Sequence, residues 1–240
     1  MGKFTDYRPP PRKEPGLLGK AIASTVALVV WLLLSLLISI MIEWVGMVWF
    51  WPEQGAGHSQ TVLTSDIVHL DARLYGHSLT IKHRVTDKVR SVMAWLDSQA
   101  GFKRLLSRSN PNDTISAIRE WGGRYYLKAE PYLQAANTVA QTFVVRLTLI
   151  IFSLPIFLLT GIIGAVDGLV ERDLRRWGGG RESSNVFNLA KRSVVPAFIG
   201  ACVIYISLPF STDPVLVLLP FALLLGLAVR IGFERLKKYF

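Results

Sequence analysis

Residues 17–51 of the chain read LLGKAIASTVALVVWLLLSLLISIMIEWVGMVWFW. Between Lys20 and Glu43 this stretch has twenty-two consecutive uncharged residues, most of them apolar. In a helix that rises about 1.5 Å per residue they reach roughly 33 Å, enough to cross a hydrocarbon core of about 30 Å. In water the same run would be an apolar patch larger than soluble monomers carry. We therefore predict that residues 17–51 form a transmembrane helix with a tryptophan-rich end.

The composition of the whole chain agrees with a membrane protein. Of its 240 residues 51% are hydrophobic, and the mean hydropathy is +0.36. The formal net charge of +10 has two explanations. Basic residues either hold loops on the cytoplasmic side of a membrane or form a surface for nucleic acid. The single cysteine, Cys202, excludes an intramolecular disulfide and a cysteine-based zinc site.

Three further apolar runs predict an all-α membrane protein with four transmembrane helices. The second run, 147–166, lies between Arg146 and Asp167, and the remaining two are separated by a short link. In that link Asp213 precedes Pro214, a good start for a helix because the carboxylate accepts a backbone N–H and proline suits the first turn. An alternative is that the last two runs form a re-entrant hairpin. The predicted transmembrane helices cover residues 17–51, 143–166, 193–210 and 214–233.

The distribution of Lys and Arg predicts the orientation. They are frequent in the tail 1–16, the loop 167–192 and the end 234–240, and absent from the link 211–213. The positive-inside rule places the three basic segments in the cytoplasm. We therefore expect a flexible cytoplasmic tail, a cytoplasmic loop and a basic cytoplasmic C-terminus, with residues 52–142 on the other side.

Residues 52–142 are expected to form an extracytoplasmic helical domain. Apolar residues recur at spacings of three and four from Leu63 to Leu96, which predicts one stripe along a long helix. A kink is expected at Gly76. A second helix is predicted from about residue 114, with a kink at Pro131. We expect the two helices to pack as an antiparallel hairpin between the first and second spans.

Glu43 and Arg146 are predicted at the same end of their spans. A charge in lipid is costly unless it is paired or reaches the interface. An intramembrane ion pair between the two residues, separate snorkelling to the interface and an ion pathway are the three possibilities. Asp66 and His69 could share one helix face, but no further ligand has metal-site spacing, so no metal and no cofactor is expected. No catalytic constellation is apparent, and we expect no enzyme.

The segment 167–192 is the most distinctive of the charged segments. Acidic and basic residues alternate before Gly178, Gly179 and Gly180, which predicts a short helix followed by a sharp reversal. The glycines do not match a phosphate-binding P-loop, although an anion-binding nest beside Arg181 is an alternative. Because Trp and Arg are favoured at interfaces, we predict a partner-docking face. Its residues are Asp167, Arg172, Asp173, Arg175, Arg176, Trp177 and Arg181.

The stretch VDGLVERDLRRWGGGRESSNVFNLAKR, residues 166–192, resembles the inner-membrane proteins of integrating conjugative elements, whose shared domain has no assigned function. The resemblance implies a bacterial inner-membrane protein that serves as an accessory component of conjugative type IV secretion. It implies a structural or interaction role beside the coupling-protein ATPase and other secretion components, with a homo-oligomer possible. It carries no catalytic residue, and direct contact with DNA is not expected. A small membrane transporter or channel is the alternative function.

Overall fold

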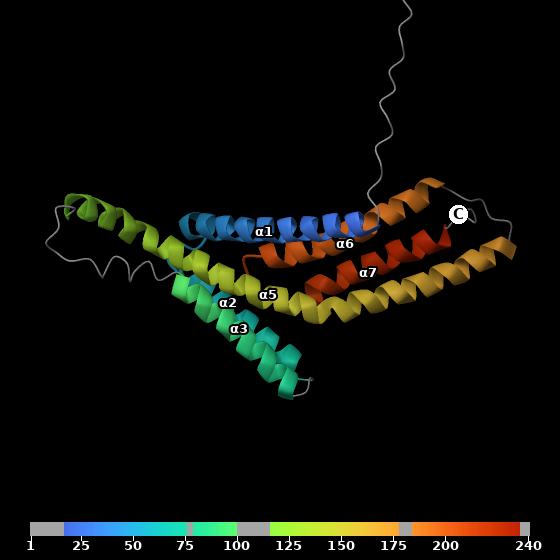
Figure 1. Cartoon of the computed structure of the whole chain (residues 1–240), viewed down its shortest axis with the longest axis horizontal. Helices are drawn as coiled ribbons and strands as arrows, with labels where there is room; N and C mark the ends of the chain where they lie inside the picture. Colours follow the sequence, from blue (N-terminus) through green and yellow to red (C-terminus); the bar gives the residue numbers. More distant parts are fainter. Residues whose placement is uncertain (1–16, 76–78, 100–115, 178–183, 236–240) are drawn as a thin grey trace, which may run out of the picture.

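The computed structural model describes residues 17–75, 79–99, 116–177 and 184–235, which are helical apart from short turns (Figure 1). The helices are α1 (Leu17–Trp49), α2 (Gly57–Leu74), α3 (Leu79–Gln99), α5 (Ser116–Trp177), α6 (Ser184–Ser207) and α7 (Pro214–Glu234). Four of them, α1, α5, α6 and α7, contain a stretch long and apolar enough to cross a membrane. The predicted all-α class with four membrane-spanning helices is confirmed.

The last two spans are separate helices joined by the link 208–213. α6 has 24 residues and α7 has 21, so they extend for roughly 36 Å and 32 Å. These lengths favour two complete crossings over a short re-entrant hairpin. α7 begins as the sequence predicts, since Asp213 Oδ1 accepts the backbone N–H of Val215 at 2.9 Å and Pro214 occupies the first turn. α6 begins at Ser184, nine residues before the predicted start of the third span.

α5 is the longest element, with 62 residues and a length of about 93 Å. The sequence predicts a helix that runs from about residue 114 towards the second span, and in the structure this helix and the span are one element. Pro131 and Pro155 lie inside it. A proline removes one backbone hydrogen bond and can bend a helix, but it need not end one whose neighbouring turns are held by packing.

α2 and α3 replace the single long helix expected over residues 63–96. α2 ends at Leu74 and α3 begins at Leu79, while Gly76, where a kink is predicted, lies outside the described residues. Both helices contact α5. On α3 the Asp97 carboxylate accepts from Asn137 Nδ2 at 2.7 Å and from Gln141 Nε2 at 2.6 Å, which ties the end of α3 to α5.

Glycines bring α5 and α7 into close contact. Gly164 faces the Gly226 carbonyl, and Gly168 faces the Arg230 carbonyl, so closely that a Cβ atom at either position would clash with backbone. A Cβ at Gly226 would lie 2.9 Å from the Thr160 carbonyl oxygen. Small residues spaced by four let membrane helices approach each other in this way.

α1 lies at the edge of the bundle, beside α5 and α6. Most of its apolar side chains are exposed, as expected for a helix that faces lipid. Near its C-terminal end the Trp44 indole nitrogen donates to the Tyr132 carbonyl of α5 at 3.0 Å. The two rings meet edge to face, with their centroids 6.3 Å apart.

A buried polar junction and a candidate docking face

Arg146 is the largest fully buried side chain in the described structure, with 1% of its surface exposed. It lies on α5, immediately before the most apolar part of that helix. We call this the Arg146 end of the bundle, and the opposite end the Asp167 end. The Arg146 Nε donates to Oδ2 of Asp66, on α2, at 2.7 Å. Because Asp66 is 0% exposed, this is a buried ion pair between a membrane helix and a helix outside the four spans.

The guanidinium of Arg146 also caps the C-terminus of α6. Nη1 donates to the carbonyls of Tyr205, Ile206 and Leu208 at 3.2, 3.0 and 2.5 Å, and Nη2 donates to Phe210 at 3.0 Å. The last carbonyls of a helix have no partner within the helix and carry a partial negative charge. A planar cation with five N–H donors can satisfy several of them at once.

Asp66 has a second partner, because Ser211 Oγ in the link donates to Oδ1 at 2.5 Å. Arg146, Asp66, Ser211 and the carbonyls at the end of α6 therefore form one network, which we call the Arg146 junction. Both charged groups are hydrogen-bonded on most of their polar atoms. That is the condition under which burying a charged pair is tolerable.

Glu43, on α1, has a partner of its own. It is 3% exposed, and both of its carboxylate oxygens lie 3.2 Å from Nδ1 of His58, at the beginning of α2. The His58 ring stacks on Trp51, with centroids 3.9 Å apart and an interplanar angle of 17°. The Trp51 indole packs directly on Gly46, where any Cβ atom would clash with it. The chain therefore folds back tightly after α1.

The predicted Glu43–Arg146 pair is thus replaced by two other pairs. Each charge meets a residue of α2, because α2 begins beside the end of α1 and then passes along α5. Asp66 was not predicted as a partner, although the sequence holds a signal for it. It lies three residues after Leu63 and four before Leu70, within the apolar stripe. A carboxylate in an apolar stripe requires a buried partner.

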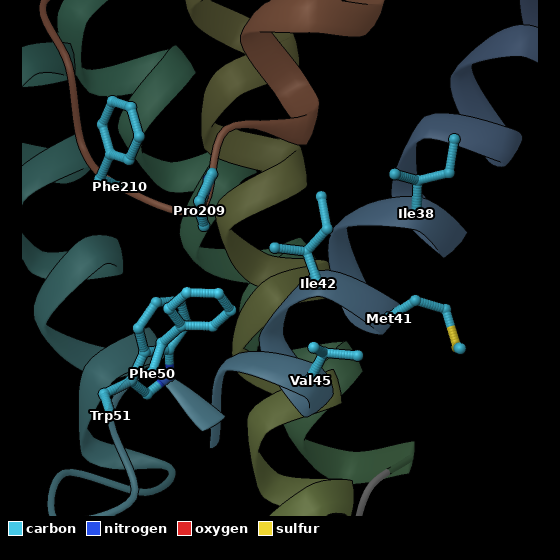
Figure 2. A pocket seen from close by; sticks show the side chains of 8 residues that line it. All are labelled: Ile38, Met41, Ile42, Val45, Phe50, Trp51, Pro209 and Phe210. Atoms are coloured by element: carbon cyan, nitrogen blue, oxygen red, sulfur yellow. The ribbon is translucent and has the colours of Figure 1, made fainter. Parts of the chain in front are cut away.

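An apolar hollow lies beside the junction, between the end of α1 and the link (Figure 2). Its volume is about 630 Å³. Figure 2 shows side chains from α1 on one side and Pro209 and Phe210 of the link on the other. The hollow is lined by Ile38, Met41, Ile42, Val45, Phe50, Trp51, Pro209 and Phe210. Its lining offers no ionisable group, so its chemistry suits hydrocarbon.

At the Asp167 end, part of the predicted docking face is bound to α7. Asp167 Oδ2 lies 2.7 Å from Nε of Arg230, and Arg175 pairs with Glu234. Neither Arg230 nor Glu234 was predicted as a partner, because both lie in the last turns of α7, far away in sequence. These two ion pairs and the glycine contacts fasten the end of α5 to α7.

Of the other predicted docking residues, Trp177 and Asp173 are exposed and Arg172 is half-buried. Trp177 is 92% exposed, and Asp173 and Arg172 lie 3.9 Å apart on the surface of α5. The side chain of Arg176 and the whole of Arg181 lie outside the described residues, as do the three glycines. The exposed indole beside Leu174, which is 62% exposed, forms an apolar surface at the end of a charged helix.

Four apolar helices, joined to α2 by a buried junction, are compatible with a multi-pass membrane protein. Within the described ranges, no three His, Cys, Asp or Glu side chains come together as metal ligands. The chain belongs to the DtrJ-like family, described as IncC plasmid conjugative DNA transfer protein DtrJ-like, whose model matches residues 50–237. Comparison with curated proteins and with solved structures gave no significant match.

The family match confirms the predicted association with conjugative DNA transfer. Membership implies that the protein takes part in that process together with other transfer components. The matched residues include both charged members of the Arg146 junction, Asp66 and Arg146, and the ion pairs at the Asp167 end.

Proposed function

We propose that this protein is an inner-membrane accessory component of a conjugative type IV secretion apparatus, with a structural and interaction role. The Arg146 junction is the observation that carries the proposal. It holds a membrane helix, a helix end, a link and α2 in one arrangement through buried, directional contacts. A scaffold that must present surfaces on two sides of a membrane needs such a fixed arrangement.

The proposed orientation follows from charge. The Asp167 end carries Arg172, Arg175, Arg230 and Arg235, whereas the link at the Arg146 end has no Lys or Arg. By the positive-inside rule the Asp167 end and both termini lie in the cytoplasm. α2 and α3 then belong to the periplasmic side.

The proposed cytoplasmic partner is the coupling-protein ATPase. Its docking face on this protein is the exposed end of α5, at Leu174 and Trp177. Tryptophan is among the residue types most enriched at the energetic centres of interfaces. Asp167 and Arg175 have a supporting role in this proposal, because their ion pairs with Arg230 and Glu234 orient the end of α5 against α7.

Co-purification of the ATPase with this protein from membranes tests the docking face. We expect Leu174→Ala combined with Trp177→Ala to abolish recovery of the ATPase and to reduce the frequency of DNA transfer. Leu216→Ala is the matched control, because Leu216 is 72% exposed on α7 at the opposite end of the bundle. Equal recovery of the ATPase by the double variant and the control would refute the docking face.

The alternative function, a transporter or channel, needs a polar path along the bundle. Most buried polar side chains of the four spans gather instead at the Arg146 end. Ser35 and Ser153, which lie deeper, donate to carbonyls of their own helices at 2.8 and 2.9 Å. The arrangement of the described residues therefore favours a scaffold.

A further inference from the structure

α2 and α3 do not project beyond the bundle of membrane helices; they run back along its side. Figure 1 shows both slanting from the level of the end of α1 back toward the level of the middle of α5. α2 is fixed at Asp66 by Arg146 and then continues to Leu74, about 12 Å further. Leu74 is fully buried in the same apolar core as Leu149 and Phe157 of α5. Leu74, the last residue of α2, therefore lies deeper along the bundle than the Arg146 junction.

Residues at the end of α2 and the start of α3 expose large apolar side chains. Tyr75 is 86% exposed, Leu79 is 74% exposed and Ile81 is 44% exposed. Apolar side chains of α2 and α3 that face α5, such as Leu70 and Val89, are packed against the core. The exposed apolar groups are thus additional to those that attach α2 and α3 to the bundle.

The exposed surface continues along α3. Val92 and Trp95, 41% and 59% exposed, follow Ile81 by eleven and fourteen residues, which places all three along one side of the helix. Arg84 and Lys88 lie between them on the same side, both exposed. Over its whole length α3 has four Lys and Arg against two Asp. Long basic side chains beside apolar ones can lay their aliphatic stems along an apolar surface and keep the charged group in a polar environment, which is favoured at membrane interfaces.

We infer that this surface binds the lipid bilayer. Tyr75, Leu79 and Ile81 enter the boundary between headgroups and acyl chains of the leaflet at the Arg146 end. Arg84 and Lys88 extend along the helix to anionic headgroups, as long basic side chains do at interfaces. The inference rests on the proposed membrane placement and deepens it: the segment 57–99 is then an interfacial element instead of a domain standing above the membrane.

The depth of a fluorophore in lipid nanodiscs tests this inference on the full chain. In a Cys202→Ala background, a single cysteine at position 79 is labelled with an environment-sensitive dye. Quenching is measured with nitroxide-labelled lipid and with aqueous iodide. We expect strong quenching by the lipid and several-fold weaker quenching by iodide than at position 60, an exposed site on the first turn of α2.

A label at position 158 separates this inference from the proposed function, because Leu158 is 67% exposed in the middle of the span on α5. If iodide reaches position 79 as readily as position 60 while position 158 stays in lipid, the inference is overturned and the membrane placement stands. Access of iodide to position 158 as well would overturn both. Protection of position 79 only after other transfer proteins are added would assign the surface to a protein partner and also overturn the inference.

Charge reversal tests the headgroup contact. Arg84→Glu with Lys88→Glu is expected to raise iodide quenching at position 79 in nanodiscs that contain phosphatidylglycerol, and to change it much less in discs of phosphatidylcholine alone. Asp87→Lys, between the two basic residues, is the control and should not raise iodide quenching. The same response of the double variant in both lipids would refute the role of the two basic side chains.

Discussion

Arg146 and Asp66 lie eighty residues apart in the sequence and form a fully buried ion pair, with Nε 2.7 Å from Oδ2. The pair joins the segment between the first two spans to the helix that follows it. Since Arg146 also caps α6, the positions of α2, α6 and the link relative to α5 depend on one side chain. The junction is therefore the part of the molecule where a single substitution should have the largest structural effect.

Removal of the acidic partner should be strongly destabilising. Asp66→Ala leaves a buried guanidinium without its counter-charge, and we expect a loss of about 3–5 kcal/mol of unfolding free energy. Thermal unfolding of the detergent-solubilised protein measures it. Asp71→Ala, an exposed site on the same helix, should stay within about 0.5 kcal/mol of the unmodified protein. Similar melting temperatures for the two variants would contradict the importance of the pair.

Exchange of the two charges should fail to restore stability. In Asp66→Arg with Arg146→Asp the ion pair is formally conserved, but a carboxylate at position 146 faces the carbonyl oxygens of Ile206 and Leu208. These oxygens repel a negative charge and lose their donor. We expect the double variant to melt no higher than Asp66→Ala. Recovery close to the unmodified protein would mean that the cap on α6 contributes little.

Substitution of two glycines on α5 that lie three residues apart should have very different effects on stability. Gly164→Ala places a Cβ against the Gly226 carbonyl, whereas at Gly161 a Cβ would meet only Leu225, at an ordinary 3.6 Å. We expect Gly164→Ala to cost about 1–3 kcal/mol as overpacking forces α5 and α7 apart. Gly161→Ala should be close to neutral in the same unfolding measurement. Crosslinking between α5 and α7 would report the separation directly.

The ion pair between Asp167 and Arg230 should contribute little to stability. The two side chains are 52% and 41% exposed, and exposed pairs contribute roughly 0–1 kcal/mol. Asp167→Asn is therefore expected to shift the unfolding free energy by less than about 1 kcal/mol, and the shift should shrink in high salt. A loss as large as that of Asp66→Ala would show that this end is less accessible to water than its exposure indicates.

The spans and the start of α7 are predictable because their signals are local. Uncharged runs mark the four spans, and Asp213 with Pro214 marks a helix start within three residues. The partners of Glu43 and Arg146 are not predictable in this way, since they depend on the direction in which α2 leaves α1. The sequence does place Asp66 within an apolar stripe, which indicates burial but not the partner. Gly164 and Gly168 likewise form a small-residue motif that indicates close packing without identifying α7.

The continuity of α5 has a mechanical consequence. About 93 Å of continuous helix is roughly three times the thickness of the hydrocarbon core, so a membrane-spanning α5 extends well beyond that core. A rigid tilt of α5 about the bundle would move Trp177 and Ser116 in opposite directions, without any change of secondary structure. Pro131 and Pro155 are the points at which α5 would bend. Bending there would reduce how much of a tilt at Trp177 is transmitted to Ser116.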